Sequence, residues 1–404
     1  MASRRLSVLG IGGAILTLSC LGPSNQVLQT KRENITSQTR GFSSIQQWLA
    51  GVSAEHEGDF DLAISHFAQA IELADEPEGA GMLHAARGRV RARRGEMALA
   101  FDDLEIALKL SPRYGNYLER AAVYMDNGQF DRALEDYDTA IGLKPNDAIL
   151  HNIRGAAFAR IHRYDLAMAD FETAMRLNPK YANAYARRGA VFGATNQHDR
   201  AFADFQVALQ LENDNTLVYN HRGLLYASKG EYDSALEDFG AALRVDPYVQ
   251  VAYLNRGAAY SQLGQFNRAV PDFVRAIELK PADSVAVLWL YLARTRNGQD
   301  AMWELQQNLR RLNLKNWPGP VADLYLGTAM NDTILRATED TDPMLYKDKR
   351  CKAYFYLGQH ALLKGNPPEA IRFFRAALDG GSPISIEYLG AREELKRLTQ
   401  MNER

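Results

Sequence analysis

This sequence is poor in the features that mark disulfide-stabilised domains and nucleic-acid binders. Its 404 residues include only two cysteines, Cys20 and Cys351, so no disulfide framework is predicted. The formal net charge is −2, and no run of lysine and arginine suggests a surface that follows nucleic-acid phosphates. Strand-like alternation is scarce and the apolar spacing is mostly helical, which predicts an all-α chain.

The sequence also lacks the short motifs of catalytic and metal sites. The 8 histidines are scattered, and there is no His-Glu-x-x-His, Cys-x-x-Cys, phosphate loop or Gly-x-Ser-x-Gly elbow. We interpret His84 and His151 as structural histidines, and Cys351 as a buried, inert thiol rather than a nucleophile. The prediction is a non-enzymatic protein with no cofactor and no metal.

The first twenty residues have the pattern of an export signal. Arg4 and Arg5 precede the uncharged stretch 6–19, which is shorter than the roughly 20 apolar residues that a membrane-spanning helix needs. The stretch ends in Leu18-Ser19-Cys20, which resembles a bacterial lipoprotein signal in which Cys20 is lipidated and becomes the mature N-terminus. The alternatives are an ordinary secretory signal cleaved near this point, or an uncleaved N-terminus. Residues 21–43 are rich in Ser, Thr, Asn and Gln, and predict a flexible tether.

A repeat of 34 residues dominates the rest of the chain. Blocks that begin at 114, 148, 182, 216 and 250 share a small residue at position 8, alanine at positions 20 and 27, and an aromatic residue at position 24. Proline often stands at position 32, where it ends the second helix of the block. The pattern resembles the tetratricopeptide repeat, in which each unit is a pair of antiparallel helices, A and B, and the small residues let the two backbones approach closely.

Stacked units of this kind form a right-handed superhelix with a concave groove, because no single unit can bury its own apolar face. We therefore predict an all-α solenoid in which seven tandem units are followed by an irregular helical segment (284–350), a late repeat-like unit (351–384) and a capping helix (385–404). The seven tandem units are expected at about 44–77, 81–113, 114–147, 148–181, 182–215, 216–249 and 250–283.

Two charged residues recur together within the repeat. Position 7 is arginine and position 23 is aspartate in six consecutive units, and the first and last units lack both. We predict a structural ladder of Arg–Asp pairs between helices A and B, within or between neighbouring units. The residues are Arg87, Arg120, Arg154, Arg188, Arg222 and Arg256, with Asp103, Asp136, Asp170, Asp204, Asp238 and Asp272.

The order of motifs after residue 284 resembles the NlpI family of envelope lipoproteins. The landmarks are "LWLYLA" (288–293), a tryptophan-containing turn before "LYLG" (324–327), "FYLGQHALLKG" (355–365) and "EYLGAREELKRL" (387–398). The array before them is longer than in that family. The resemblance implies a non-enzymatic adaptor in the periplasm, anchored to the outer membrane by lipid. It further implies binding of a carboxyl-terminal processing protease and peptidoglycan hydrolases, and a homodimer formed through the N-terminal helices.

The groove of such arrays is lined mainly by positions 2, 5, 9, 12 and 13 of helix A. Polar residues at or beside these positions are candidates for binding a peptide backbone or a terminal carboxylate, with the alternative that they are only solvated. They are Arg89, Arg93, Asn152, Arg160, Asn220, Asn255 and Gln262.

Two other functions stay open from the sequence. Lipidated arrays also serve as assembly or piloting factors for secretion or pilus systems, although such a factor does not need the interruption after residue 284. If the signal is not lipidated, the protein would be soluble in the periplasm or secreted, and if it is not a signal at all, the protein would be a cytoplasmic scaffold.

Overall fold

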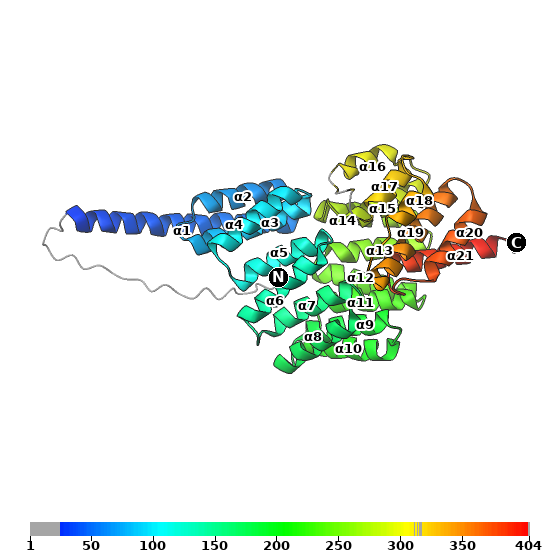
Figure 1. The fold of residues 1–404 in the computed structure, drawn as a ribbon, viewed down its shortest axis with the longest axis horizontal. Helices are drawn as coiled ribbons and strands as arrows, with labels where there is room; N and C mark the ends of the chain where they lie inside the picture. Colours follow the sequence, from blue (N-terminus) through cyan, green and yellow to red (C-terminus); the bar gives the residue numbers. More distant parts are fainter. Residues whose placement is uncertain (1–24, 311, 313, 315–316, 403–404) are drawn as a thin grey trace.

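The computed structural model describes residues 25–310, 312, 314 and 317–402, and every regular element in these ranges is a helix (Figure 1). The lipoprotein-type signal predicted for residues 1–20, with its lipid-attachment candidate Cys20, lies outside the described residues. The helices form an extended, curved stack rather than layers around a single centre, as expected for a solenoid.

Each of the seven tandem units holds one pair of antiparallel helices, A then B. The pairs are α1 (Asn25–Glu57) with α2 (Phe60–Glu72), α3 (Pro77–Arg94) with α4 (Met97–Leu110), α5 (Tyr114–Asp126) with α6 (Phe130–Leu143), α7 (Ala148–Arg160) with α8 (Tyr164–Leu177), α9 (Ala182–Ala194) with α10 (His198–Leu211), α11 (Thr216–Ser228) with α12 (Tyr232–Val245), and α13 (Gln250–Gln262) with α14 (Phe266–Leu279).

The close approach of the two helices in a unit depends on the small residue of helix A. A Cβ atom at Gly155 would lie 2.7 Å from the ring of Phe171, and one at Gly223 would lie 2.7 Å from the ring of Phe239. Both phenylalanines are fully buried. The glycine at position 8 thus makes the space that the aromatic residue at position 24 fills, and any larger side chain there would push the helices apart.

The turn from helix A to helix B requires a residue in the left-handed conformation at position 15. Gly128, Gly230 and Gly264 supply it in three units, with φ between 74° and 80°. His162 and Asn196 adopt the same conformation in the fourth and fifth units, with φ of 61° and 59°. Asparagine and histidine are among the non-glycine residues that tolerate this region best, so the turn geometry is kept.

The six arginines and six aspartates of the ladder pair within their own units. In each pair the Nε and Nη2 atoms of the helix A arginine donate to the two carboxylate oxygens of the helix B aspartate, at 2.6–2.9 Å. The aspartates are 2–6% exposed, whereas the arginines keep part of their surface in solvent. Each pair is a two-bond fork, which fixes the rotation of helix A against helix B.

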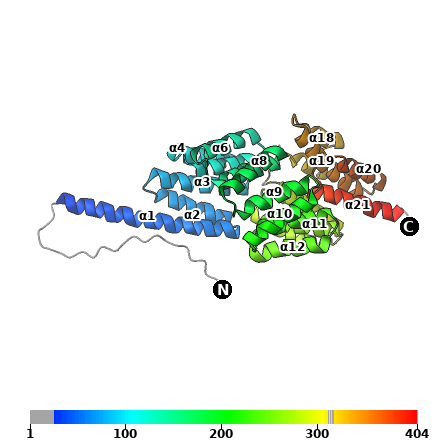
Figure 2. The ribbon, with the colours of Figure 1, turned by 90° about the horizontal axis from the view of Figure 1, so that it is seen from below.

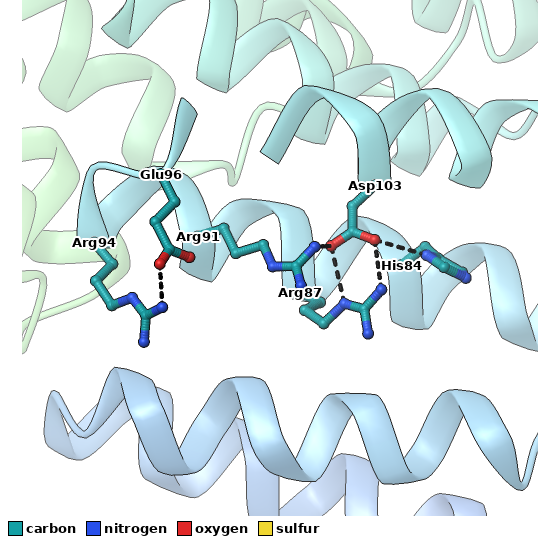
Figure 3. Close-up of polar contacts among 6 residues, drawn as sticks. All are labelled: His84, Arg87, Arg91, Arg94, Glu96 and Asp103. Atoms are coloured by element: carbon teal, nitrogen blue, oxygen red, sulfur yellow. Dashed lines mark hydrogen bonds and ion pairs between the residues drawn. The ribbon is translucent and has the colours of Figure 1, made fainter. Parts of the chain in front are cut away.

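Asp103, in the second unit, binds more partners than the other ladder aspartates (Figure 3). His84 Nδ1 lies 2.8 Å from one of its oxygens, and Arg91 Nη1 donates to the other at 2.7 Å, beside the fork from Arg87. Burial alone would raise the pKa of Asp103, but these partners hold it below its usual value. His151 lies in the same way beside Asp170, at 3.4 Å, so both of these histidines are joined to the ladder.

The segment predicted as a flexible tether is helical from Asn25 onward. Helix α1 runs for 33 residues and extends well past α2 (Figure 1). The cause is visible in the sequence, because Asn25 to Arg40 contains no glycine or proline that would end a helix. The polar composition that suggested a tether is equally compatible with a helix that projects from the array.

The chain after residue 283 forms a compact helical segment that ends the array. It consists of α15 (Ser284–Arg296), α16 (Met302–Leu309), α17 (Gly319–Tyr325), α18 (Asn331–Arg336), α19 (Pro343–Leu363), α20 (Pro367–Leu378) and α21 (Ile386–Asn402). The motif 288–293 of α15 is entirely buried in the largest hydrophobic cluster, where Trp289 stacks on Phe355 with ring centroids 5.0 Å apart. The late repeat-like unit corresponds to α19 and α20, and α19 already begins at Pro343, ahead of the predicted boundary.

The array also curls until its first units contact its sixth and seventh. Arg93 Nη2 donates to the carbonyl of Leu279 at 2.8 Å, and Lys280 Nζ lies 2.9 Å from Asp126. The rings of His56 and Tyr248 lie 4.1 Å apart. Figure 1 shows the end of α14 close to the first helix pairs. These long-range contacts stabilise the curved form of the array.

We predict that breaking one rung of the ladder destabilises the fold. Asp204→Ala removes both acceptors of Arg188 and leaves a partly buried guanidinium without its partner, so the free energy of unfolding should fall by about 1–3 kcal/mol. Chemical denaturation monitored by circular dichroism measures this change. The matched control is Glu237→Ala, which removes an exposed carboxylate from α12 and should cost less than about 0.5 kcal/mol. Equal effects of the two variants would contradict a structural role for the ladder.

Candidate functional site: the inner wall of the array

The A helices form the concave side of the array. Helix α3 contacts α5, and α7, α9, α11, α13 and α15 contact one another in succession. We call the groove-facing surface of these helices the inner wall. All seven groove residues predicted from the sequence lie on A helices, but the structure divides them among separate groups instead of joining them in one site.

Arg89 and Arg93 are committed to carboxylates of the chain itself. Arg89 donates to both oxygens of Glu55, at 3.0 and 2.7 Å, and lies 2.5 Å from Glu119. Arg93 donates to Glu55 at 3.0 Å. Burial alone would raise the pKa of Glu55, but the two arginines hold it below its usual value. This cluster joins three neighbouring units and engages both arginines in contacts within the chain.

Arg160 is likewise paired. Its Nη1 atom donates to Asp126 at 2.8 Å, and the same carboxylate accepts from Lys280. Asp126 is therefore held by two cations, which keep its pKa below the usual value although burial alone would raise it. The two ion pairs of Asp126 join the third and fourth units to the end of the seventh, so Arg160 helps to stabilise the curved form of the array.

Asn220, Asn255 and Gln262 are buried contacts in the interior. Asn255 Nδ2 donates to Asn220 Oδ1 at 2.9 Å, and Gln262 Nε2 donates to the carbonyl of Ile386 at 3.2 Å. Each side chain is 4–6% exposed. The part of the inner wall near Gln262 is filled by the C-terminal helix α21, which contacts α13 and lies beside α11 in Figure 2.

Helix α21 is held there by two arginines that reach the ends of A helices. Arg392 Nη2 donates to the carbonyl of Ala227 at 2.9 Å, and Arg397 Nη2 donates to the carbonyl of Gln262 at 2.6 Å. Both carbonyls lie at the C-terminal ends of their helices, where a positive charge is favoured by the helix dipole. The predicted capping helix therefore covers the side of the array as well as its end.

The remaining candidate, Asn152, lies beside two residues that the sequence analysis passed over. Its Nδ2 atom donates to the hydroxyl of Tyr181 at 3.2 Å, whereas its buried Oδ1 atom accepts no hydrogen bond from the residues that the structure describes. Arg187 and His221 occupy position 6 of the next two A helices. Arg187 was overlooked because it stands directly before the ladder residue Arg188. The sequence did contain a signal. The fifth unit has two adjacent arginines, Arg187 and Arg188, but one ladder aspartate, so one of the two arginines has no partner of the ladder type.

A polar cleft of 1070 Å³ separates the third and fourth units from the C-terminal segment. Several charged side chains of the cleft contact one another. Asp348 lies 2.6 Å from Lys352 and 3.5 Å from His162, and Asp340 lies 2.7 Å from Lys349. Burial alone would raise the pKa of Asp348, but Lys352 and His162 hold it well below its usual range. Of these contacts, the one between Asp348 and His162 joins the C-terminal segment to the array, and the other two lie within the segment.

The described side chains offer no other reactive centre. Cys351 is buried, and burial raises the pKa of its thiol far above the ordinary value, so a thiolate does not form. Within the described ranges, no three His, Cys, Asp or Glu side chains gather in a way that could hold a metal ion. Over the same residues, no helix has the length and apolar character needed to cross a membrane.

Comparison with known proteins places the repeats in a family. Two family models described as tetratricopeptide repeat match the chain, one at residues 217–248 and 251–283 and the other at residues 118–182 and 352–383. The second match to the latter model covers the late unit formed by α19 and α20. Thus both the tandem array and the segment after it contain this repeat.

Similar proteins match over the repeats. Serine/threonine-protein phosphatase 5 of Mus musculus is 36% identical over 90 residues, which are 22% of this chain and 17% of the phosphatase. The chain therefore spans about a sixth of the length of that relative. Tetratricopeptide repeat protein 36 of Homo sapiens is 29% identical over 128 residues, 30% of this chain and 66% of the relative.

Among solved structures, a tetratricopeptide repeat protein from Parabacteroides merdae is 20% identical and has a TM-score of 0.46, covering 63% of this chain and 99% of its own. No catalytic family is indicated by the matches, and the repeats are of a type that binds protein partners. The chain therefore contains tetratricopeptide repeats, which imply a scaffold for protein–protein interaction.

Proposed function

We propose that this protein is a non-enzymatic periplasmic adaptor, anchored to the outer membrane through a lipid on Cys20. In this proposal it holds a carboxyl-terminal processing protease and peptidoglycan hydrolases, and so controls the turnover of cell-wall enzymes. Binding both on one rigid scaffold raises the effective concentration of the protease at its substrate. In this proposal the adaptor brings its partners together and catalyses no reaction itself.

The observation that carries the proposal is the common core of the NlpI-like motifs. Trp289 of the first motif stacks on Phe355 of the third. Tyr325 of the second donates to the carbonyl of Tyr356, at 3.0 Å. Gly390 of the fourth faces Phe355, where a Cβ atom would lie 2.6 Å from the ring. Four motifs spread over about 285–398 are thus parts of one folded unit, which supports reading their shared order as a family feature.

The N-terminal helix offers a surface for a second copy of the chain. Gly51 and Ala54 of α1 face α2, and Ser44 Oγ donates to the carbonyl of Ala70 at 2.9 Å. A different face of α1 carries an exposed apolar stripe at helical spacing. The stripe consists of Phe42, Ile45, Leu49 and Val52, which are 64%, 55%, 53% and 37% exposed, with Trp48 beside them. We propose that two copies pair through this stripe.

The partner prediction is tested by isolating the tagged full-length protein from detergent-solubilised envelopes. A carboxyl-terminal processing protease or a peptidoglycan hydrolase should co-purify in stoichiometric amounts and be identified by mass spectrometry. Secretion or pilus subunits without a protease would instead favour the assembly-factor alternative, and the absence of any specific partner would contradict the adaptor proposal.

The anchoring prediction is tested by Cys20→Ser. The wild-type protein should fractionate with outer membranes and the variant should not, because a residue without the thiol cannot carry the lipid. The mass of the mature N-terminus provides an independent measurement. An unmodified cysteine in a membrane-free wild-type protein would contradict lipid anchoring and leave the soluble alternative.

The dimer prediction is tested by Ile45→Glu combined with Leu49→Glu. Two carboxylates in the stripe should convert the protein from a dimer to a monomer at micromolar concentration, measured by sedimentation equilibrium. Leu166→Glu is the matched control, since it changes a similarly exposed leucine on α8, which is 48% exposed. A wild-type protein that is already monomeric would contradict pairing through α1.

A further inference from the structure

The curl of the array creates a second cleft, with a volume of 1420 Å³, where the start of the array meets its end. One wall consists of residues 57–61 and 94–99, at the A–B turns of the first two units, and the other consists of α14 with residues of α15 and α16. In Figure 1 the first wall lies at the right-hand ends of the first helix pairs and faces α14 and α16. We call this space the seam cleft.

The seam cleft differs from the concave groove in what forms it. The groove follows from the stacking of A helices, whereas the seam cleft requires the first two units to meet the seventh. A Cβ atom at Gly58 would lie 3.2 Å from the carbonyl oxygen of Glu278, so the turn of the first unit closely approaches the end of α14. Arg93, which donates to the carbonyl of Leu279, holds the second unit to the same place. An array that stayed open would have the groove but not this cleft.

Negative charge is in excess in the seam cleft. Six carboxylates and three guanidinium groups line it, which gives a formal charge of −3, whereas the whole chain carries −2. Arg294 pairs with Glu304 from outside the lining, so it offsets one of these charges and the excess remains negative. The six carboxylates belong to Glu57, Asp59, Asp61, Glu96, Glu278 and Glu304.

Two of these carboxylates, those of Glu57 and Asp59, form no ion pair with any residue that the structure describes. Glu57 accepts a hydrogen bond from Ser53 Oγ at 3.2 Å, and Asp59 accepts one from the backbone N–H of Leu62 at 3.0 Å, as the N-cap of α2. Both side chains are exposed. The A–B turn of the first unit therefore adds two negative charges to the cleft that no cation of the described chain offsets.

The same cleft is also lined by apolar side chains. Phe60, Ile277 and Leu290 are buried, whereas Leu99, on α4, is 45% exposed. An exposed large apolar side chain within a concave surface is a feature of interaction sites, because covering it removes apolar area from water. A ligand that complements the seam cleft therefore needs both positive charge and apolar side chains.

We propose that the seam cleft is a docking site for a basic segment of a partner protein, in which lysine or arginine alternates with apolar residues. The cationic side chains pair with Glu57 and Asp59, and the apolar side chains cover Leu99. An acidic segment is repelled, and a neutral one leaves the two carboxylates without partners. The inference rests on the proposed adaptor function, which it deepens by giving the chemistry of the segment that the adaptor holds.

The probes are two pools of fluorescein-labelled dodecapeptides with amidated carboxyl termini. Each pool alternates a fixed polar residue with randomised apolar residues, and the fixed residue is lysine in one pool and glutamine in the other. Binding to the full-length protein is measured by fluorescence polarisation at about 0.15 M salt. Wild-type protein should bind the lysine pool at least about fivefold more tightly than the glutamine pool, the effect of two exposed ion pairs.

Glu57→Gln combined with Asp59→Asn should abolish this preference, because it removes both carboxylates that lack a cation. Asparagine caps a helix as well as aspartate does, so α2 should keep its start and the melting temperature should not change. The matched control is Asp165→Asn combined with Glu172→Gln, which removes the same charge from exposed positions of α8 and should retain the preference.

Leu99→Asn tests the apolar part of the cleft independently. It should weaken binding of the lysine pool by about threefold or more, because less apolar area is then covered. Leu166→Asn, which changes a leucine on α8 that is 48% exposed, should not.

Equal binding of the two pools by wild-type protein, or absence of binding, would overturn the inference. So would a preference that survives Glu57→Gln with Asp59→Asn, or an unchanged affinity in Leu99→Asn. An equally large effect of the α8 controls would also overturn it, because binding would then follow the overall charge and apolar surface of the protein.

These outcomes are distinct from failure of the adaptor proposal. If envelope partners co-purify equally with wild-type protein and with the Glu57→Gln, Asp59→Asn variant, and the peptide pools show no preference, the adaptor stands and the seam cleft is not its docking site. If no partner co-purifies with wild-type protein but the lysine pool binds through the cleft, the adaptor proposal fails and the cleft remains a site for basic segments.

Discussion

Six buried aspartates, each bound side-on by an arginine of the preceding helix, are the constraint on which the array depends. Apolar packing of the position 24 ring on the position 8 glycine supplies most of the attraction between helices A and B. Such packing tolerates rotation, whereas the two-bond fork does not. Buried ion pairs add little net stability against their desolvation cost, so their main effect here is to fix one register in each of the six units that carry them. Repetition of that register gives the whole array its curvature.

A uniform curvature has consequences far along the chain. It brings the first three units to the end of the seventh, where Arg93 reaches the carbonyl of Leu279 and Lys280 reaches Asp126. As a result, most of the charged side chains on the inner wall form ion pairs with other residues of the chain. The C-terminal helix α21 fills a further part of it through Arg392 and Arg397. The polar residues of the inner wall are therefore mostly part of the architecture.

The local structure could be predicted well from the sequence, because each repeat position has a local cause. Gly155 indicates a close approach of two helices, and Pro179 indicates the end of a helix. The spacing of 16 residues between Arg188 and Asp204 indicates a contact between the two helices of one unit. The groove could not be predicted in the same way. Whether Arg93 is free depends on Leu279, 186 residues later, and no periodic pattern encodes a contact at that separation. The predicted tether failed for the opposite reason, since composition alone does not distinguish a solvated helix from a flexible segment.

An adaptor needs surfaces that can be occupied at the same time. The apolar stripe lies on α1, whereas none of the residues that line the polar cleft beside the C-terminal segment belongs to α1. Two copies paired through the stripe would therefore leave the cleft outside their interface.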